Sequence, residues 1–221
     1  MPASTASLPG WLAPRETALL VIDMQHDYCS PSGHLARNGR DISAIEAIIP
    51  QVAGLIAAAR QAGVLVLYTR QTTLPGGASV GAARRRYRDL AKPGLGSDYP
   101  LSGTPGHAII AELAPSDADV VVDKFRSSGF FQTRLDLVLR AQGRKTTVIC
   151  GAVTEGCIES TVRDAANYDY LPVIASDAVA STDAALHAAA MTVMRGRYDC
   201  VPSSDIMTAW LGNDAHRVKA S

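Results

Sequence analysis

The chain has 221 residues, 47% of them hydrophobic, which is enough for one well-buried domain and short for two. Lys and Arg together number 21, as do Asp and Glu, so the net charge is zero and no overall field attracts nucleic acid or an anionic membrane surface. We therefore expect no nucleic-acid partner, no membrane partner, and a small molecule as ligand.

The beginning of the chain and its cysteines indicate a cytoplasmic protein. Residues 1–16 lack the basic start and apolar core of a signal peptide, and no apolar run reaches the length needed to span a membrane. The cysteines show neither the density of a disulfide scaffold nor a CxxC pair for zinc, and they stand at positions 29, 150, 157 and 200. We expect an N-terminal arm at 1–16, one domain at 17–213 and a C-terminal tail at 214–221.

In chain order, short apolar runs alternate with helical patterns. Strands are predicted at 17–22, 64–69, 119–123, 147–150, 171–175 and 199–201. Helices are predicted at 42–63, around 135–139, from Thr154 as N-cap, at 182–195 and at 203–211. Apolar strands alternating with helices predict an α/β fold, a three-layer α/β/α sandwich around a parallel six-stranded sheet of Rossmann-like type.

The segment 70–118 is the least regular part of the chain. It contains Gly76-Gly77 and the basic run Arg84-Arg85-Arg86. A long loop of this kind usually carries function or contacts another subunit. The arginines either bind an anionic group or form a solvated helix face, and we favour the solvated face.

Three reactive groups follow predicted strands. Asp23 follows the first, Lys124 the third and Cys157 the fourth, where it falls in the first turn of a helix. The carboxyl ends of parallel strands share one edge of the sheet, so these side chains can meet there. Unpaired N–H groups at a helix start favour a thiolate and a developing oxyanion. The alternatives are that Cys157 only packs under the sheet and that Asp23 only caps a turn.

The chemistry of the three groups is complementary. A thiol needs a base to become a nucleophile. Asp23 can take the proton of Cys157 and return it to a leaving nitrogen, while Lys124 holds the carboxylate and lowers the thiol pKa. The combination predicts acyl transfer to sulfur followed by hydrolysis with water.

The sequence resembles the isochorismatase-like cysteine hydrolases. The segments that carry the resemblance are VIDMQ at 21–25, DK at 123–124 and GAVTEGCIEST at 151–161. The resemblance implies the isochorismatase-like hydrolase fold and a catalytic triad of Asp23, Lys124 and Cys157. It also implies a cis peptide between Ala152 and Val153, with the amides of Val153 and Cys157 forming the oxyanion hole.

The resemblance further narrows the reaction. Members that cleave a vinyl ether lack the nucleophilic cysteine, so Cys157 implies C–N bond cleavage. The segment 69–73 lacks the metal-binding Asp-x-His cluster of nicotinamidases, so we expect no metal and no cofactor. The segments around Lys124 and Cys157 look most like the carbamoyl and ureide amidohydrolases of the superfamily. A homo-oligomer, either a dimer or a tetramer, is implied by the resemblance alone.

Five residues are candidates for substrate contacts: Gln25, Tyr28, Phe125, Arg126 and Glu155. Arg126 is either an anion clamp or part of a structural ion pair. Glu155 either lines the pocket or complements the helix dipole.

Two other functions compete with the amidohydrolase. One is a Cys–His thiol hydrolase that uses His26 or His34 in place of Lys124. The other is a nucleotide- or partner-binding domain without catalysis. The segment after the first strand has no glycine-rich phosphate loop, which disfavours the binding domain.

Overall fold

The computed structural model describes residues 8–91, 93–96 and 98–212, so the whole of the expected tail at 214–221 and residues 1–7 of the expected arm lie outside the described residues. Its centre is a six-stranded sheet of order β3-β2-β1-β4-β5-β6, whose neighbouring strands run parallel. The strands are Thr17–Ile22 (β1), Leu65–Gln71 (β2), Val120–Lys124 (β3), Thr146–Ala152 (β4), Leu171–Ala180 (β5) and Asp199–Val201 (β6). The predicted α/β fold with a six-stranded parallel sheet is confirmed.

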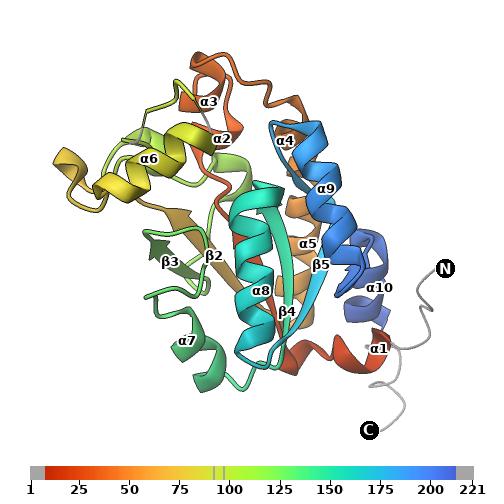
Figure 1. Cartoon of the computed structure of the whole chain (residues 1–221). Coiled ribbons are helices and arrows are strands. Elements are labelled where there is room, and N and C mark those ends of the chain that lie inside the picture. Colours follow the sequence, from red (N-terminus) through yellow and green to blue (C-terminus); the bar gives the residue numbers. More distant parts are fainter. Residues whose placement is uncertain (1–7, 92, 97, 213–221) are drawn as a thin grey trace, which may run out of the picture.

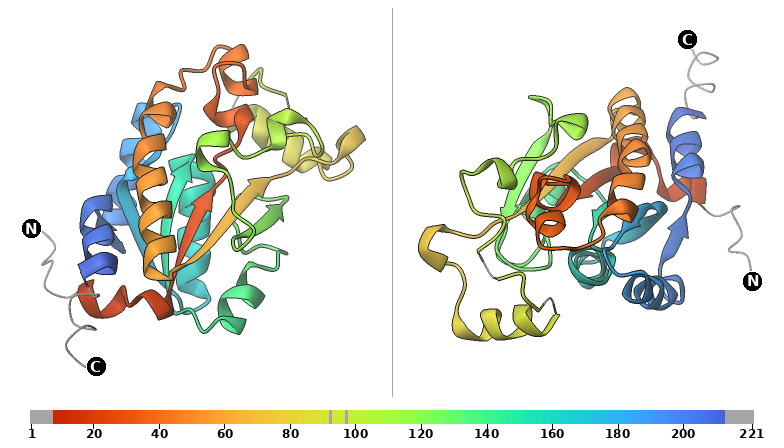
Figure 2. Two further views of the ribbon diagram at one scale, coloured as in Figure 1. Left: turned by 180° about the vertical axis from the view of Figure 1, so that it is seen from behind. Right: turned by 90° about the horizontal axis from the view of Figure 1, so that it is seen from above.

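Helices cover both faces of this sheet, as Figures 1 and 2 show. On one face lie Ser43–Ala47 (α4), Ile49–Ala62 (α5) and Ser203–Gly212 (α10), and on the other lie Leu135–Ala141 (α7), Glu159–Asn167 (α8) and Ala184–Arg195 (α9). The shorter helices are Leu8–Trp11 (α1), His26–Cys29 (α2) and His34–Arg37 (α3), and Ala82–Ala91 (α6) stands apart from both layers.

The strand β1 illustrates how the sheet is buried on both faces. Its residues are all buried, and alternate side chains point to opposite faces. Leu19 and Val21 join the apolar cluster under α5 and α10, whereas Leu20 and Ile22 join the cluster under α7, α8 and α9. The continuous apolar run is therefore the sequence of a central parallel strand.

The single helix predicted at 42–63 is two helices in the structure. The chain leaves α4 at Ile48 and starts α5 at Ile49, with Pro50 in the first turn of the new helix. Proline has no N–H to donate to the preceding turn, so the break falls where the sequence places it. The helix α5 ends at Gly63, whose φ of 73° gives the left-handed cap that its sequence predicts.

The expectation that no apolar run is long enough to cross a membrane needs correction. Among the described residues, Ser43–Ala62 is long and apolar enough by length and composition. Val52 and Leu55 of this segment are fully buried in the core under the sheet. A core helix passes the same test, so the finding is weak evidence for a membrane span.

Two strands run further than the sequence indicates. Gly151 does not end β4, which continues to Ala152, and β5 reaches Ala180. Ser176 and Asp177 look like a turn in the sequence, but they lie where the register of β5 against β4 shifts. The Asp177 carboxylate accepts hydrogen bonds from the N–H (2.7 Å) and the hydroxyl (2.8 Å) of Ser203 at the start of α10. Asp177 thus contacts the start of α10 without ending the strand.

The described part of the expected arm is packed against the domain. Leu12 is 1% exposed and belongs to the core, and the Thr146 hydroxyl donates a hydrogen bond to the Trp11 carbonyl at 2.7 Å. The cysteines of the chain are free thiols, as its sequence predicts.

Gly151 is the position at which the sheet tolerates no side chain. It has a φ of 117°, and an added Cβ would lie 2.2 Å from the Ile22 carbonyl oxygen of β1. We predict that Gly151→Ala lowers the free energy of unfolding by about 3 kcal/mol, because backbone strain and a clash with backbone add. Gly63→Ala, at a φ of 73° with open space around it, should cost only about 1 kcal/mol. Urea unfolding of both variants measures the difference, and equal losses would contradict the steric argument.

Candidate active site

The three predicted reactive side chains meet at the carboxyl edge of the sheet. Lys124 is the last residue of β3, and its Nζ lies 2.8 Å from Asp23 Oδ2 and 3.2 Å from Cys157 Sγ. Asp23 and Lys124 are fully buried, whereas Cys157 is partly exposed. The fold therefore joins residues separated by 101 and 33 positions in the chain (124 minus 23, and 157 minus 124).

The backbone after β1 directs Asp23 inward. Asp23 has a φ of 52°, a left-handed conformation that turns the chain sharply at the end of the strand. The Thr69 hydroxyl of β2 donates a hydrogen bond to Asp23 Oδ1 at 2.7 Å, and the Asp23 N–H donates to the Thr69 carbonyl at 3.2 Å. Asp23 Oδ1 thus contacts Thr69, and Asp23 Oδ2 contacts Lys124.

Cys157 lies in a π-helical turn, η6 at Thr154–Ile158, which leads into α8. Thr154 is not the N-cap that its sequence suggests, because the cap residue is Val153 and no side chain caps the turn. The Thr154 hydroxyl instead pairs with His187 Nδ1 at 2.8 Å. The Ala152–Val153 peptide bond is cis. The Gly156 N–H donates to the Val153 carbonyl at 3.2 Å, whereas the N–H groups of a first turn that lack such an acceptor are available to an oxygen atom of a ligand.

The electrostatics of the site keep the resting thiol protonated. Burial raises the pKa of Cys157 to about 11, Lys124 lowers it and Asp23 raises it. Burial also lowers the pKa of Lys124, but the contacts with Asp23 and Cys157 outweigh burial and raise it above its ordinary value. At neutral pH the site therefore holds an ammonium group beside a neutral thiol.

Gln71 is a member of the site that the sequence analysis missed. It is the last residue of β2, and its Oε1 accepts a hydrogen bond from Lys124 Nζ at 3.0 Å. The Arg126 carbonyl accepts another from Nζ at 3.1 Å. The signal was present, because Gln71 is a polar residue at the end of a buried strand, as Asp23 is.

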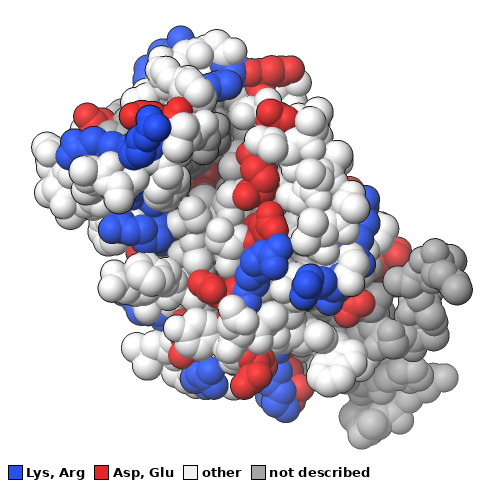
Figure 3. All heavy atoms as spheres, in the orientation of Figure 1, with Lys and Arg blue, Asp and Glu red and all other residues white. Residues whose placement is uncertain are grey.

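A cavity of about 320 Å³ opens above the thiol. Two predicted contact residues, Tyr28 and Glu155, line it together with Cys157. Its far wall comes from the segment 70–118, whose contributions include Arg84, Tyr87, Arg88 and Tyr99. Figure 3 shows the surface hollowed between α6 and the starts of α8 and α9.

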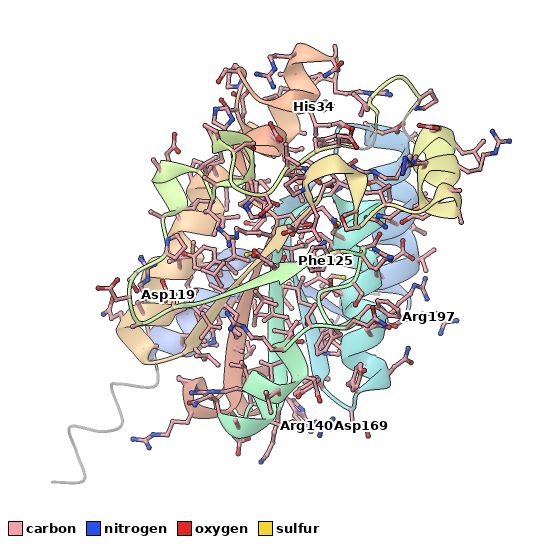
Figure 4. All side chains as sticks on the ribbon, turned by 90° about the vertical axis from the view of Figure 1, so that its left-hand side faces the viewer. His34, Asp119, Phe125, Arg140, Asp169 and Arg197 are labelled. Carbon is pink, nitrogen blue, oxygen red and sulfur yellow. The ribbon has the colours of Figure 1, made fainter. Side chains whose placement is uncertain are left out.

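The other three predicted contact residues are not among those that line this cavity. Gln25 is fully buried. Its Nε2 donates hydrogen bonds to the carbonyl of Gln71 at the end of β2 (3.1 Å) and to the carbonyl of His107 (2.9 Å). Phe125 lies at the end of β3, as Figure 4 shows, and is half-buried. The Arg126 guanidinium donates through Nη1 to the carbonyls of Phe125 (2.7 Å) and Ser79 (3.3 Å), and the ion pairs found among the described residues do not include it.

The basic run does not form a uniformly solvated face. Arg85 and Arg86 are exposed on α6, as the favoured interpretation predicts. Arg84 is 9% exposed and faces the cavity. Periodicity alone did not show which side of α6 faces the site, because that depends on the path of the whole segment 70–118.

The histidines considered for a Cys–His enzyme have other partners. His26 Nε2 pairs with the Ser32 hydroxyl at 3.0 Å, and His34 Nε2 with the Leu95 carbonyl at 2.7 Å. Within the described residues, neither ring forms a hydrogen bond with Cys157. In the same part of the chain, no group of three or more His, Cys, Asp or Glu side chains is placed to hold a metal ion.

Comparison with known proteins agrees with this geometry. Residues 17–205 match the isochorismatase domain family. The chain is 37% identical over 175 residues to the ureidoacrylate amidohydrolase RutB of Azorhizobium caulinodans, covering 76% of this chain and 77% of that protein. It is 35% identical over 199 residues to the protein of the same name from Variovorax paradoxus, covering 80% and 79%.

A solved structure shows the same similarity. The crystal structure of a cysteine hydrolase from Pseudomonas syringae pv. phaseolicola superposes with a TM-score of 0.80 at 31% sequence identity, covering 90% of this chain and 94% of that one. The resemblance seen in the sequence is thereby confirmed. The chain belongs to the isochorismatase family and is an isochorismatase-like hydrolase.

Proposed function

We propose that the protein is a cysteine-dependent amidohydrolase that cleaves a C–N bond of a small carbamoyl or ureide compound. The observation that carries the proposal is the Lys124 ammonium, which lies 2.8 Å from the Asp23 carboxylate and 3.2 Å from the Cys157 sulfur at the floor of a cavity. The names of the relatives support the substrate class, and ureidoacrylate is the first compound to test.

The reaction begins with transfer of the thiol proton to Asp23. Because the pKa of Cys157 is about 11, the thiolate forms only as the base accepts the proton and Lys124 stabilises the negative sulfur. The sulfur then attacks the carbonyl carbon, forming a C–S bond. The N–H groups of Val153 and Cys157 bind the developing oxyanion, and each donor contributes about 2.7 to 4 kcal/mol in comparable sites.

The tetrahedral intermediate collapses by breaking the C–N bond. Asp23 returns the proton to the leaving nitrogen, and a thioester-type acyl-enzyme remains on Cys157. Asp23 then deprotonates a water molecule that attacks the acyl carbon and displaces the sulfur. With a ureide as substrate the released carbamate decomposes to carbon dioxide and ammonia, so ammonia release reports turnover.

The charged residues around Cys157 predict the direction in which each substitution shifts the pKa of its thiol. We predict that the alkylation rate of Cys157 by iodoacetamide rises with pH around a pKa of about 11. Lys124→Met should shift the profile to higher pH because the ammonium lowers the thiol pKa, and Asp23→Asn should shift it to lower pH. Mass spectrometry resolves each cysteine. Cys200, whose pKa burial raises to about 11, is the internal control and should not move in either variant. Shifts in the reverse directions would contradict the assigned roles.

Substitutions distinguish the mechanism with Lys124 and Cys157 from the alternative Cys–His enzyme. We predict that Cys157→Ala and Lys124→Met each reduce ammonia release from ureidoacrylate by at least about 1000-fold, because each removes a group that acts in the chemical step. His26→Ala and His34→Ala should keep most of the activity. Loss of activity in a histidine variant with Lys124→Met still active would favour the Cys–His enzyme. Full activity in Cys157→Ala would exclude cysteine catalysis.

The same proposal includes two further points. The protein forms a homo-oligomer, and it works in the reducing cytoplasm. Large apolar side chains that reach solvent support the oligomer, among them Trp11 (57% exposed), Leu90 (64%) and Leu137 (69%). Free cysteines support the setting. We predict that light scattering gives two or four times the chain mass of 23.3 kDa. A mass of one chain at working concentrations would overturn the oligomer and leave the chemistry untouched.

A further inference from the structure

One buried cation at the cavity has no role in the proposed chemistry. Arg84 lies on α6, is 9% exposed and lines the cavity that opens above Cys157. Its Nη1 donates a hydrogen bond to the Tyr87 hydroxyl, a neutral partner on the same helix. Arginine cannot escape burial by losing its proton under ordinary conditions, so its charge has to be met by something else.

The described part of the chain offers Arg84 no counter-charge. The ion pairs of the described residues do not include it, and the charges acting on it include those of Arg88 and Arg126, which are also positive. Burial lowers the pKa of Arg84, the contact with Tyr87 opposes burial, and Arg88 and Arg126 act in the same direction as burial. A desolvated guanidinium among like charges is unfavourable, and an anion bound in the cavity would stabilise it.

The described aromatic residues of the wall are neutral, and a second cation lies beside them. Burial raises the pKa values of Tyr28 and Tyr99, so these phenols stay neutral at physiological pH. The Arg88 guanidinium lies 4.9 Å from the centre of the Tyr99 ring and donates to the Tyr99 carbonyl at 2.8 Å, which places a second cation on this wall. Figure 3 shows Lys and Arg side chains gathered over α6 beside the hollow.

The cavity that Arg84 lines also has a carboxylate among its residues. Glu155 precedes Cys157 by two positions and lines the cavity. Its Oε2 is buried and, among the described residues, has no hydrogen-bond partner. An acceptor of this kind suits the N–H groups of a ureide or carbamoyl nitrogen and repels an anion. The cavity thus combines an N–H acceptor two positions before Cys157 with the cations of α6.

We propose that Arg84 is a specificity-determining residue that binds a carboxylate of the substrate, so that the enzyme selects ureido or carbamoyl acids over their neutral analogues. This inference rests on the proposed function, because it assigns one end of the substrate of that site. The planar guanidinium can donate two parallel hydrogen bonds to a carboxylate, and such charge-assisted pairs are the strong ones.

The test compares an anionic and a neutral substrate. Ammonia release is measured from ureidoacrylate and from its methyl ester. Arg84→Met should lower kcat/KM for the acid by about 10- to 100-fold, mainly through KM, because one charge-assisted contact is lost. The ester should change little. Arg84→Lys should restore part of the activity toward the acid alone.

Arg85→Met is the matched control, because it removes an exposed arginine from the same helix. It should leave both substrates unaffected, and thermal unfolding should show all variants equally folded. Equal losses for acid and ester in Arg84→Met, or no loss for the acid, would overturn the assignment.

A binding measurement keeps the inference separate from the proposed function. If the wild-type protein releases ammonia from neither compound, the proposed substrate fails, but the anion site is still tested. Calorimetry then compares succinamate with the neutral succinamide, both added to the Cys157→Ala variant. Tighter binding of the acid, lost when Arg84→Met is added, supports the site. Equal affinities with Arg84 in place would overturn it.

Discussion

The buried ammonium of Lys124 is the interaction on which the arrangement of the site depends. Four acceptors surround Nζ: an Asp23 oxygen at 2.8 Å, Gln71 Oε1 at 3.0 Å, the Arg126 carbonyl at 3.1 Å and Cys157 Sγ at 3.2 Å. An ammonium has three protons, so it cannot bond to all four fully at once, and the longest contact is the one to sulfur. Breaking a buried pair costs about 3 to 5 kcal/mol even where forming it gains little, so Lys124 specifies how the strand ends are placed.

The same contacts explain why the thiol of Cys157 stays protonated when no substrate is bound. Burial and the Asp23 carboxylate favour the neutral thiol more than Lys124 favours the anion. In the proposed reaction negative charge therefore moves from carboxylate to sulfur only when a substrate is present to be attacked. The ammonium then shifts its hydrogen bonding toward sulfur without moving far, because Sγ is already within 3.2 Å. A site of this kind limits alkylation or oxidation of the empty enzyme.

The sequence predicts the side chains at the strand ends, which form the floor of the cavity, better than the side chains of α6, which form its wall. Asp23, Lys124 and Cys157 were found because parallel topology brings the carboxyl ends of strands together, whatever the loops do. Gln71 obeys the same rule and was missed only because the amide group carries no reactive signature. Arg84 is different, since its inward direction depends on the path of a long irregular segment that periodicity does not specify. The break before Pro50 was missed although the proline marks it in the sequence, whereas the irregular register of β5 depends on strand pairing that exists only in the folded state.

This contrast divides the chain by function. Residues at the strand ends hold the groups to which we assign the chemistry, and their positions are specified by sheet register and by full burial of Asp23 and Lys124. The α6 wall belongs to a segment outside the two helical layers, and it brings Arg84 and Arg88 to the cavity without joining the sheet. A substitution of Arg84 or Arg88 therefore changes the wall of the cavity without removing any contact of Lys124. The converse does not hold, because any change in the length or path of β3 moves Lys124 and the Arg126 carbonyl together, and with them the geometry of the thiol.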